Sequence, residues 1–187
     1  MTDKTAADRL WDFSLDIYRR RDVESACLSL QARCGVSVSL LLASIWLGLN
    51  GDGRMGTMRL ESAAWRALEW HREFVEPLRA LRRQLRHRPP AGLENDAERF
   101  RARLLEQELA AERMEQRLFL NDLDYWPPTE PRGNWRDAVG NAALLVRRSC
   151  PRPENEAVAA FVTVLAATCP HVKRDALLEA TRETLSE

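Results

Sequence analysis

The segment VSLLLASIWLGL, residues 38–49, decides the fold. Apolar side chains cover almost every side of a helix built from it, and the run is longer than a typical buried strand and does not alternate. A helix that is apolar all round belongs at the centre of a helical bundle. Ser37 stands where an N-cap would begin it, and glycines follow its end. The segment therefore predicts a buried central helix.

The glycines after this segment, within residues 51–56, have the spacing G-x-G-x-x-G of a dinucleotide-binding turn. That turn requires a strand before it and a parallel partner strand after its helix. The chain downstream shows only helical periods. We therefore interpret the glycines as a loop between two helices. Arg54, Arg59 and the helix start at Thr57 remain a weaker candidate for holding one phosphate.

Helical periodicity also dominates the rest of the chain. One long helix after residue 57, kinked or divided by Pro77, is predicted to bury a continuous stripe: Leu60, Ala64, Ala67, His71, Phe74, Leu78, Leu81 and Leu85. Residues 89–92 mark a turn before a second long helix, so the two form an antiparallel hairpin. We predict an all-α fold, a single bundle of about seven helices around residues 38–49, with this long antiparallel hairpin beside it.

The whole chain, residues 1–187, is predicted to form one helical domain. Residues 1–121 would make the main bundle, and residues 122–133 a proline-rich linker. Residues 134–187 would supply C-terminal helices that pack on the bundle, because so short a segment buries too little surface to fold alone.

Composition excludes several classes of protein. The formal net charge is zero, whereas nucleic-acid and anionic-membrane binding rely on a basic excess. The first residues are polar and show no signal-peptide pattern, so we expect none, and the longest apolar run is shorter than the roughly 20 residues of a membrane span. The four cysteines include no C-x-x-C pair. We expect a cytoplasmic protein with free thiols, no membrane span and no nucleic-acid partner.

A cluster of arginines occupies the first helix of the hairpin: Arg79, Arg82, Arg83, Arg86 and Arg88. It could form a phosphate or nucleic-acid patch, or it could pair with the acidic residues of the second helix. We favour the ion pairs. With a turn near residue 90, Arg82 would lie near Glu98 and Arg86 near Glu94.

Patterns for metal binding and catalysis are missing. A di-iron bundle needs Glu three residues before His, and the three histidines have Leu, Gln and Thr there. No serine or cysteine lies in a recognisable nucleophile motif. We expect no catalytic residue, no metal and no cofactor. His71 falls on the apolar stripe and is interpreted as a hydrogen-bonded core histidine, with ligand contact as the alternative.

Aromatic residues beside the proline-rich stretch, Tyr125 and Trp126, form another candidate contact. Aromatic side chains next to prolines can make a partner-binding surface. The more common arrangement folds such side chains back over the end of the bundle, and we favour it here.

Two stretches of the chain carry a family resemblance. The segment WDFSLDIYRRRDVESACLSLQARCGVSVSLLLASIWLG, residues 11–48, and the segment VEPLRALRRQLR, residues 75–86, resemble an uncharacterised family of small proteobacterial proteins. The resemblance implies a bacterial, cytosolic, all-helical protein and brings no activity, cofactor or catalytic residue. Most shared positions are apolar. Ser14 and Gln31 are polar exceptions that could bond across the core or line a small pocket.

These features favour a non-enzymatic interaction or regulatory protein that acts through helical surfaces on a protein partner, with self-association as one form. The alternative is a module that binds a small apolar or phosphorylated ligand between helices, and an enzyme ranks third. A cavity lined by Ser14, Gln31 and His71 would favour the ligand, whereas an exposed apolar patch would favour the protein partner.

Overall fold

The structure, a computed structural model, describes residues 4–51, 53–123, 125 and 133–186. The described residues contain helices and no strand, so the predicted all-α fold is confirmed. The elements are α1 (Ala6–Tyr18), α2 (Val23–Cys34), α3 (Val38–Asn50), α4 (Thr57–Trp70), the π-helical turn η1 (His71–Val75), α5 (Glu76–His87), α6 (Glu94–Asp122), α7 (Trp135–Ser149), α8 (Asn155–Thr168) and α9 (Arg174–Ser186).

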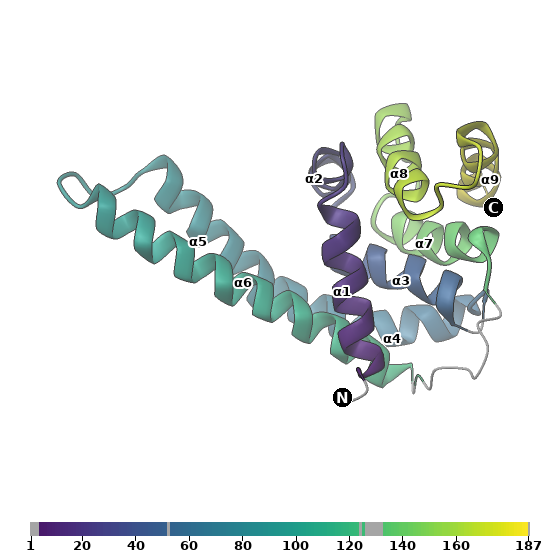
Figure 1. The fold of residues 1–187 in the computed structure, drawn as a ribbon, viewed down its shortest axis with the longest axis horizontal. Helices are drawn as coiled ribbons and strands as arrows, with labels where there is room; N and C mark the ends of the chain where they lie inside the picture. Colours follow the sequence, from purple (N-terminus) through teal and green to yellow (C-terminus); the bar gives the residue numbers. More distant parts are fainter. Residues whose placement is uncertain (1–3, 52, 124, 126–132, 187) are drawn as a thin grey trace.

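Helix α3 is the central apolar helix that its sequence predicts. The hydroxyl of Ser37 accepts a hydrogen bond from the backbone N–H of Leu40 at 3.2 Å and so caps its start. Leu41 and Ile45 are fully buried, on a helix that packs against α7, α6 and α1 (Figure 1). Because the segment is a helix, the strand that a dinucleotide-binding turn requires is not formed at this place.

The loop after α3 is fastened to the body by α7. The backbone N–H of Met55 donates to Asn141 Oδ1 at 2.8 Å, and Asn141 Nδ2 donates to the carbonyl of Gly53 at 3.1 Å. Helices α3 and α7 also approach closely at Gly48, where a Cβ atom would overlap the backbone of Ala138. The glycines therefore serve helix packing and a change of chain direction.

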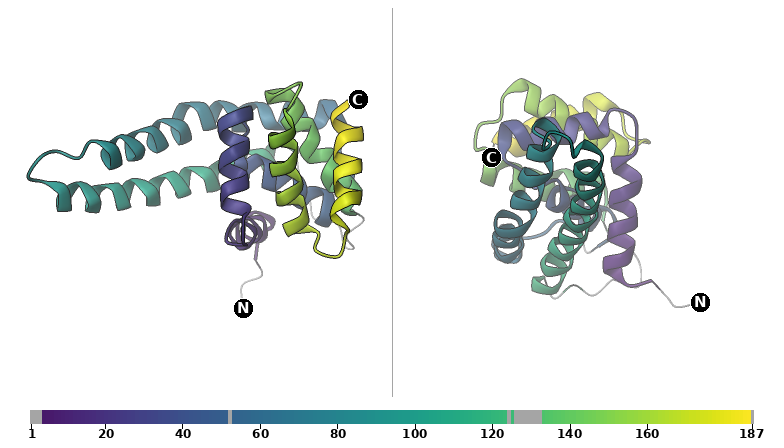
Figure 2. Two further views of the ribbon diagram at one scale, coloured as in Figure 1. Left: turned by 90° about the horizontal axis from the view of Figure 1, so that it is seen from above. Right: turned by 90° about the vertical axis from the view of Figure 1, so that its left-hand side faces the viewer.

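Two apolar cores flank α3. One gathers side chains of α2, α3, α7, α8 and α9, and the other joins α3 to α4, α7 and the inner end of α6. Helix α8 packs on α2, and α9 lies against both α7 and α8 (Figure 2). These helices, together with α1, form the compact part of the molecule, here called the body.

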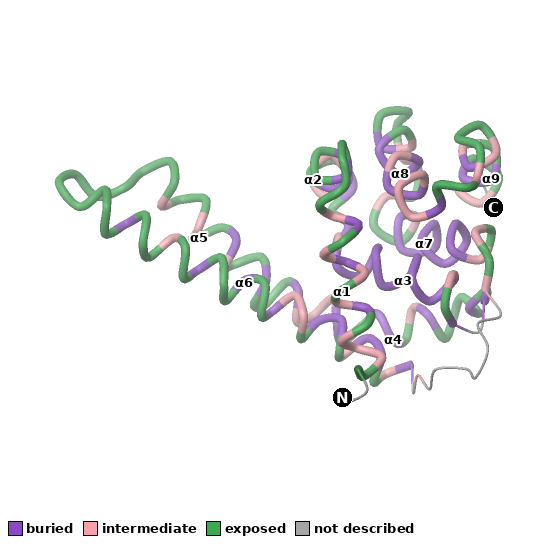
Figure 3. The backbone as a smooth tube through the Cα atoms, viewed as in Figure 1, coloured by how far each residue is buried: buried purple, intermediate pink, exposed green. Residues whose placement is uncertain are grey.

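Helix α5 and the outer part of α6 project from the body as a two-helix arm (Figures 1 and 2). This is the predicted antiparallel hairpin. Figure 3 shows burial concentrated in the body, while the far half of the arm is mostly exposed. Pro77 does lie at a division of the long helix, because the π-helical turn η1 ends directly before the first turn of α5.

The prediction of a continuous stripe of core residues after residue 57 is wrong for the part of the stripe that follows His71. The π-helical turn adds a residue to one turn and so rotates the following helix. Buried positions therefore run from His71 to Val75 and Arg79, whereas Phe74 and Leu81 are 46% and 42% exposed. Residues that a regular period would have placed in the core lie instead on the outside of the arm.

No single helix among the described residues is both long and apolar enough to cross a membrane. Helices α2 and α3 taken together are long and apolar enough to cross a membrane, but the chain bends by 114° between them.

Candidate functional site

Two hollows lie at the root of the arm, on different sides of α6. The first, here called the junction cleft, opens between α1, α2, α3 and the two arm helices and has a volume of about 370 Å³. The second, here called the outer groove, runs between α4, η1 and α6 and has a volume of about 460 Å³. Met114 lines the groove and Gln116 lines the cleft; two residues apart on one helix, they point about 200° apart.

A cluster of buried ion pairs forms one wall of the junction cleft. Arg79 donates from Nε to Glu108 Oε1 at 2.8 Å and from Nη2 to Glu112 Oε1 at 2.5 Å. Arg82 Nε donates to Glu108 Oε2 at 2.6 Å. Burial would raise the pKa of Glu108, but the two arginines more than offset it and hold that pKa below its usual value. These bonds join the two arm helices where they leave the body.

The predicted register of the hairpin is wrong. Arg82 pairs with Glu108 and not with the neighbourhood of Glu98, ten residues nearer the tip. The turn is the cause, because α5 ends at His87 while the chain runs on before α6 begins at Glu94 (Figure 1). Arg79 and Arg82 therefore meet later residues of α6 than a tight turn would give.

The floor of the cleft is a second polar network. Gln116, 1% exposed, donates from Nε2 to Ser14 Oγ at 2.8 Å and to the carbonyl of Ser39 at 3.2 Å. The hydroxyl of Ser14 itself donates to the carbonyl of Leu10 at 2.9 Å. Ser14 Oγ and the Ser39 carbonyl therefore both accept hydrogen bonds from the amide nitrogen of Gln116, which fixes the orientation of the amide. Gln116 Oε1 has no hydrogen-bond partner among the described residues.

His71 lies behind this network, in the π-helical turn. Its Nδ1 is 3.1 Å from Oε2 of Glu115, a fully buried carboxylate that also accepts the hydroxyl of Ser37 at 2.5 Å. Burial alone would lower the pKa of His71, but the hydrogen bond and charge of Glu115 outweigh it, so the pKa lies above 6.5. The arrangement has the hydrogen-bonded core position that the sequence suggested for this residue.

Replacing His71 with glutamine should destabilise the protein more in mild acid than in mild base. A raised pKa in the folded state stabilises fully below the unfolded value of 6.5, and this contribution is lost as pH rises through the folded value. We expect H71Q to lower the free energy of unfolding by about 1.5–3 kcal/mol at low pH. Urea titrations at about pH 5.5 and about pH 8.5 would measure it. An equal loss at both pH values would contradict the charged pair, and H87Q, at an exposed position, is the control.

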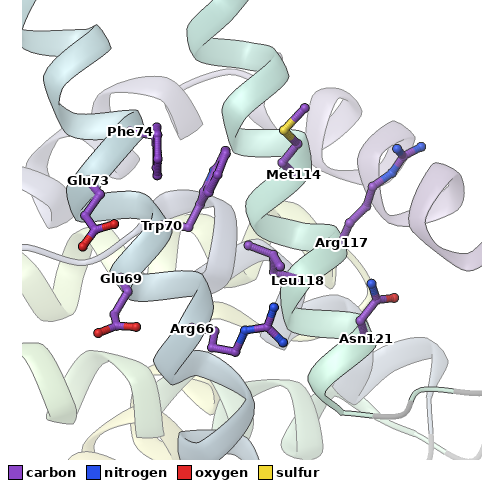
Figure 4. Close-up of a pocket in the computed structure, with 9 residues that line it drawn as sticks. All are labelled: Arg66, Glu69, Trp70, Glu73, Phe74, Met114, Arg117, Leu118 and Asn121. Carbon is purple, nitrogen blue, oxygen red and sulfur yellow. The ribbon is translucent and has the colours of Figure 1, made fainter.

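The outer groove has an aromatic floor. Trp70 and Phe74 stack with ring centroids 4.1 Å apart, and Trp70 Nε1 donates to the carbonyl of Ala111 at 2.9 Å. In Figure 4 the Trp70 ring reaches across the groove toward Met114 and Leu118 on α6. Phe74 and Met114 are 46% and 50% exposed, so the apolar floor faces solvent.

The rim of the groove is charged unevenly. Glu69 and Glu73 follow the edge formed by α4 and η1 (Figure 4). Glu73 has no ion pair within the described part of the chain, and Glu69 meets Arg72 only at 4.0 Å. Arg66 is held by Asp122 at 2.8 Å. This edge of the groove therefore presents unbalanced negative charge.

Comparison with known proteins places the chain in a family. The family model described as "Protein of unknown function (DUF2390)" matches residues 9–119, more than half of the chain. The chain belongs to the DUF2390 family. The resemblance found from residues 11–48 and 75–86 is thereby confirmed at the level of an uncharacterised, all-helical family. No curated protein and no solved structure matches the chain.

The segment matched by DUF2390 contains both helices of the arm and every side chain that lines the junction cleft. It also contains the aromatic floor of the outer groove. Helices α7–α9 lie beyond it; α7 packs on α3, α8 on α2, and α9 on α7 and α8. The cleft therefore belongs wholly to the part of the chain that is common to DUF2390.

The structure brings most of the predicted site residues together. The following line the junction cleft: Ser14, Gln31, Arg79, Arg82 and Arg83. His71 is not among the cleft's lining residues, and Arg86 lies nearer the arm tip, beside Glu94 and Glu98. Tyr125 packs edge-on against Trp46, with ring centroids 5.6 Å apart. Trp126 and most of the predicted linker lie outside the described residues.

The sequence predicted ion pairs with the acidic residues of the second arm helix, but it did not identify which carboxylates make them. Glu108, Glu112 and Glu115 follow one another at spacings of four and three on α6, and Gln116 is adjacent. Such spacing places them on one face of the helix, the face that also carries the buried Leu104. Three carboxylates on a core face are the signal that could have been used, because they require partners. The described residues contain no cluster of side chains suited to a metal ion.

Proposed function

We propose that this DUF2390 protein is a non-enzymatic docking protein that holds an amphipathic helix of a protein partner in its outer groove. The observation that carries the proposal is the solvent-exposed aromatic floor made by Trp70 and Phe74 beside Met114. Half-exposed large apolar side chains gathered in one groove are typical of interaction sites. The ionisable groups at the arm root pair with one another, so we assign them no reaction.

The shape of the groove suits a helix. Its two long walls are themselves helical, α4 with η1 on one side and α6 on the other. A third helix laid between them would present side chains at positions i, i+3, i+4 and i+7 to the floor. Complete burial of an aromatic or methionine side chain contributes about 1.5–3 kcal/mol, and Phe74 and Met114 each have about half of that left to gain.

The charge on the rim of the outer groove predicts which residues border the apolar face of the partner helix. Glu69 and Glu73 lie on the rim with at most one loose ion pair between them and the described chain, whereas Arg66 is already bound to Asp122. A lysine or arginine on the partner helix would gain a carboxylate partner there. The partner proposed here therefore carries an apolar face bordered by basic residues.

A synthetic helix tests the proposal. A peptide of about 18 residues, about 27 Å long as a helix, would carry Leu and Phe on one face and Lys along its borders. We expect it to bind the full chain at least about tenfold more tightly than the same peptide with Glu in place of Lys, a difference of about 1.4 kcal/mol. Fluorescence anisotropy of a labelled peptide would measure both affinities.

Two substitutions give the matched comparison for this test. F74D places a charge on the groove floor and should abolish peptide binding, whereas M58D changes an 86% exposed apolar residue of α4 that does not line the groove and should have no effect. Equal binding of the two peptides, or undiminished binding to F74D, would overturn the proposal. Peptide binding should leave circular dichroism of the chain unchanged except for added helix.

A further inference from the structure

Two of the cysteines are neighbours in the fold although they are far apart in the sequence. Cys34 is the last residue of α2, and Cys150 directly follows the end of α7, over a hundred residues later. Both belong to the apolar core shared by α2, α3, α7, α8 and α9, Cys34 as a buried member and Cys150 packed against it. Their thiols interact directly, side chain to side chain. The fold therefore brings two thiols together.

Contacts on both sides of this pair show that the end of α2 lies against the end of α7. Arg33 Nη1 donates to Glu154 Oε2 at 3.2 Å, which joins the last turn of α2 to the residue before α8. On the other side, Val36 and Ser149 line one small hollow. The cysteines lie within a few residues of these contacts, so the packing of the helices sets their proximity.

Both cysteines lie at helix ends, where the backbone can adjust to a bond between them. Cys34 is followed by Gly35, which ends α2 in the left-handed conformation, and Cys150 is followed by Pro151 in the connection to α8. A disulfide needs Cα atoms about 4.4–6.8 Å apart. A shift at a helix end can reach this separation without breaking hydrogen bonds in the middle of a helix.

The other two cysteines lie in different surroundings. Cys27 is fully buried and precedes Cys34 by seven residues, about 10 Å along the same helix. Cys169 is also fully buried, and its sulfur lies 3.6 Å from the hydroxyl oxygen of Thr168. These two cysteines therefore serve as internal controls for the pair.

The two paired thiols differ in access to solvent, which sets the order in which they react. Cys150 is partly exposed, whereas Cys34 is 5% exposed. Burial, together with the neighbouring thiol, raises the pKa of Cys34 above its usual value, so little of it is present as the reactive thiolate. The charges of Arg33 and Glu154 act on it in opposite directions. A dissolved oxidant therefore meets Cys150 first.

We propose that Cys34 and Cys150 form a redox-sensitive pair, which peroxide converts to a disulfide that fastens α7 to α2. The sulfur of Cys150 attacks one peroxide oxygen, the O–O bond breaks, and the products are a sulfenic acid and water. The sulfur of Cys34 then attacks the sulfenic sulfur, the S–S bond forms and the S–O bond breaks. The departing hydroxide takes the Cys34 proton and leaves as water, so each sulfur has lost one electron to the peroxide.

The bond joins two parts of the chain. Cys34 lies within the segment matched by DUF2390, residues 9–119, and Cys150 lies beyond it. Closing so long a loop restricts the unfolded chain. We therefore expect the oxidised protein to unfold at a midpoint temperature about 5–10 °C above that of the reduced protein. The pair is separate from the outer groove and goes beyond the docking function.

Oxidation of the reduced full chain tests the proposal. After treatment with a small excess of hydrogen peroxide, digestion without reductant and mass spectrometry should find the peptides of Cys34 and Cys150 joined. Thermal unfolding should show the higher midpoint, and dithiothreitol should restore the original one. Peptides joined through other cysteines, a disulfide between two copies of the chain, or an unchanged midpoint after oxidation would overturn the proposal.

Single substitutions assign the roles of the cysteines. C150A, at a partly exposed position, should lose the midpoint shift, while C27A and C169A should still form the link. In C34A, dimedone should trap Cys150 as its sulfenic acid. A midpoint shift that persists in C150A, or a dimedone label on Cys34 of the unsubstituted chain and none on Cys150 of C34A, would contradict the pair and its order. F74D should still form the disulfide, so failure of the docking proposal is separate from failure of this one.

Discussion

Replacing Arg79 with alanine should lower the free energy of unfolding by about 3–5 kcal/mol. The guanidinium is the only bridge between Glu108 and Glu112 among the described residues, and its side chain is 10% exposed. Removing it leaves two carboxylates at the arm root with Arg82 as their remaining cation. Buried charge without a partner is among the few causes of so large a loss. Urea denaturation followed by circular dichroism would measure the change.

Arg83 supplies the matched control for this experiment. It lies on the same helix, four residues on, and has no ion pair in the described part of the chain. R83A should therefore change the free energy of unfolding by no more than about 0.5 kcal/mol. Similar losses for R79A and R83A would show that the helix needs basic residues in general and not this buried pairing.

Replacing Gly48 with alanine should cost about 1–3 kcal/mol of stability. The new Cβ would overlap the backbone of Ala138, and neither α3 nor α7 can move without opening the cores that flank them. Thermal unfolding should show a clearly lower midpoint temperature for G48A.

Gly56 gives the comparison for the same substitution. It has a φ of −64°, and a Cβ atom there would meet nothing within 4 Å. G56A should leave the protein unchanged or stabilise it by up to about 1 kcal/mol, because alanine restricts the unfolded chain. If G48A were as stable as G56A, the close approach of α3 and α7 would be contradicted.

Local sequence signals predicted the body well. The apolar run after Ser37, together with the hydroxyl that caps it, is sufficient to define α3. Gly35 ends α2 in the left-handed conformation that glycine permits. Signals of this kind act over a few residues, so periodicity and capping chemistry detect them without knowledge of the fold.

In the arm, such local signals were not sufficient to predict the structure. The sequence predicts a hairpin, but not the extra residue in the π-helical turn, which moved Phe74 from the core stripe to the surface. It does not give the reach of the turn either, and the turn decides that Arg82 meets Glu108. Packing between helices sets which face of a helix points inward and which residues of two helices lie opposite each other. A shift of one residue in either changes every contact farther along the helix. The outer groove and the junction cleft both result from these two long-range features.

The docking proposal places function at the root of the arm. The groove and the cleft lie on opposite sides of α6, within the segment matched by DUF2390 or at its border. The ion pairs of Arg79 join the two arm helices at their root, and the bonds of Glu115 tie α6 to the body.

The docking function is tested most directly by intermolecular nuclear Overhauser effects between the chain and the Lys-bordered peptide. If the outer groove is the docking site, apolar protons of the peptide will show contacts with the side chains of Trp70, Phe74 and Met114. Contacts confined to Leu105 and Leu109 in the junction cleft, or to the arm tip, would contradict it.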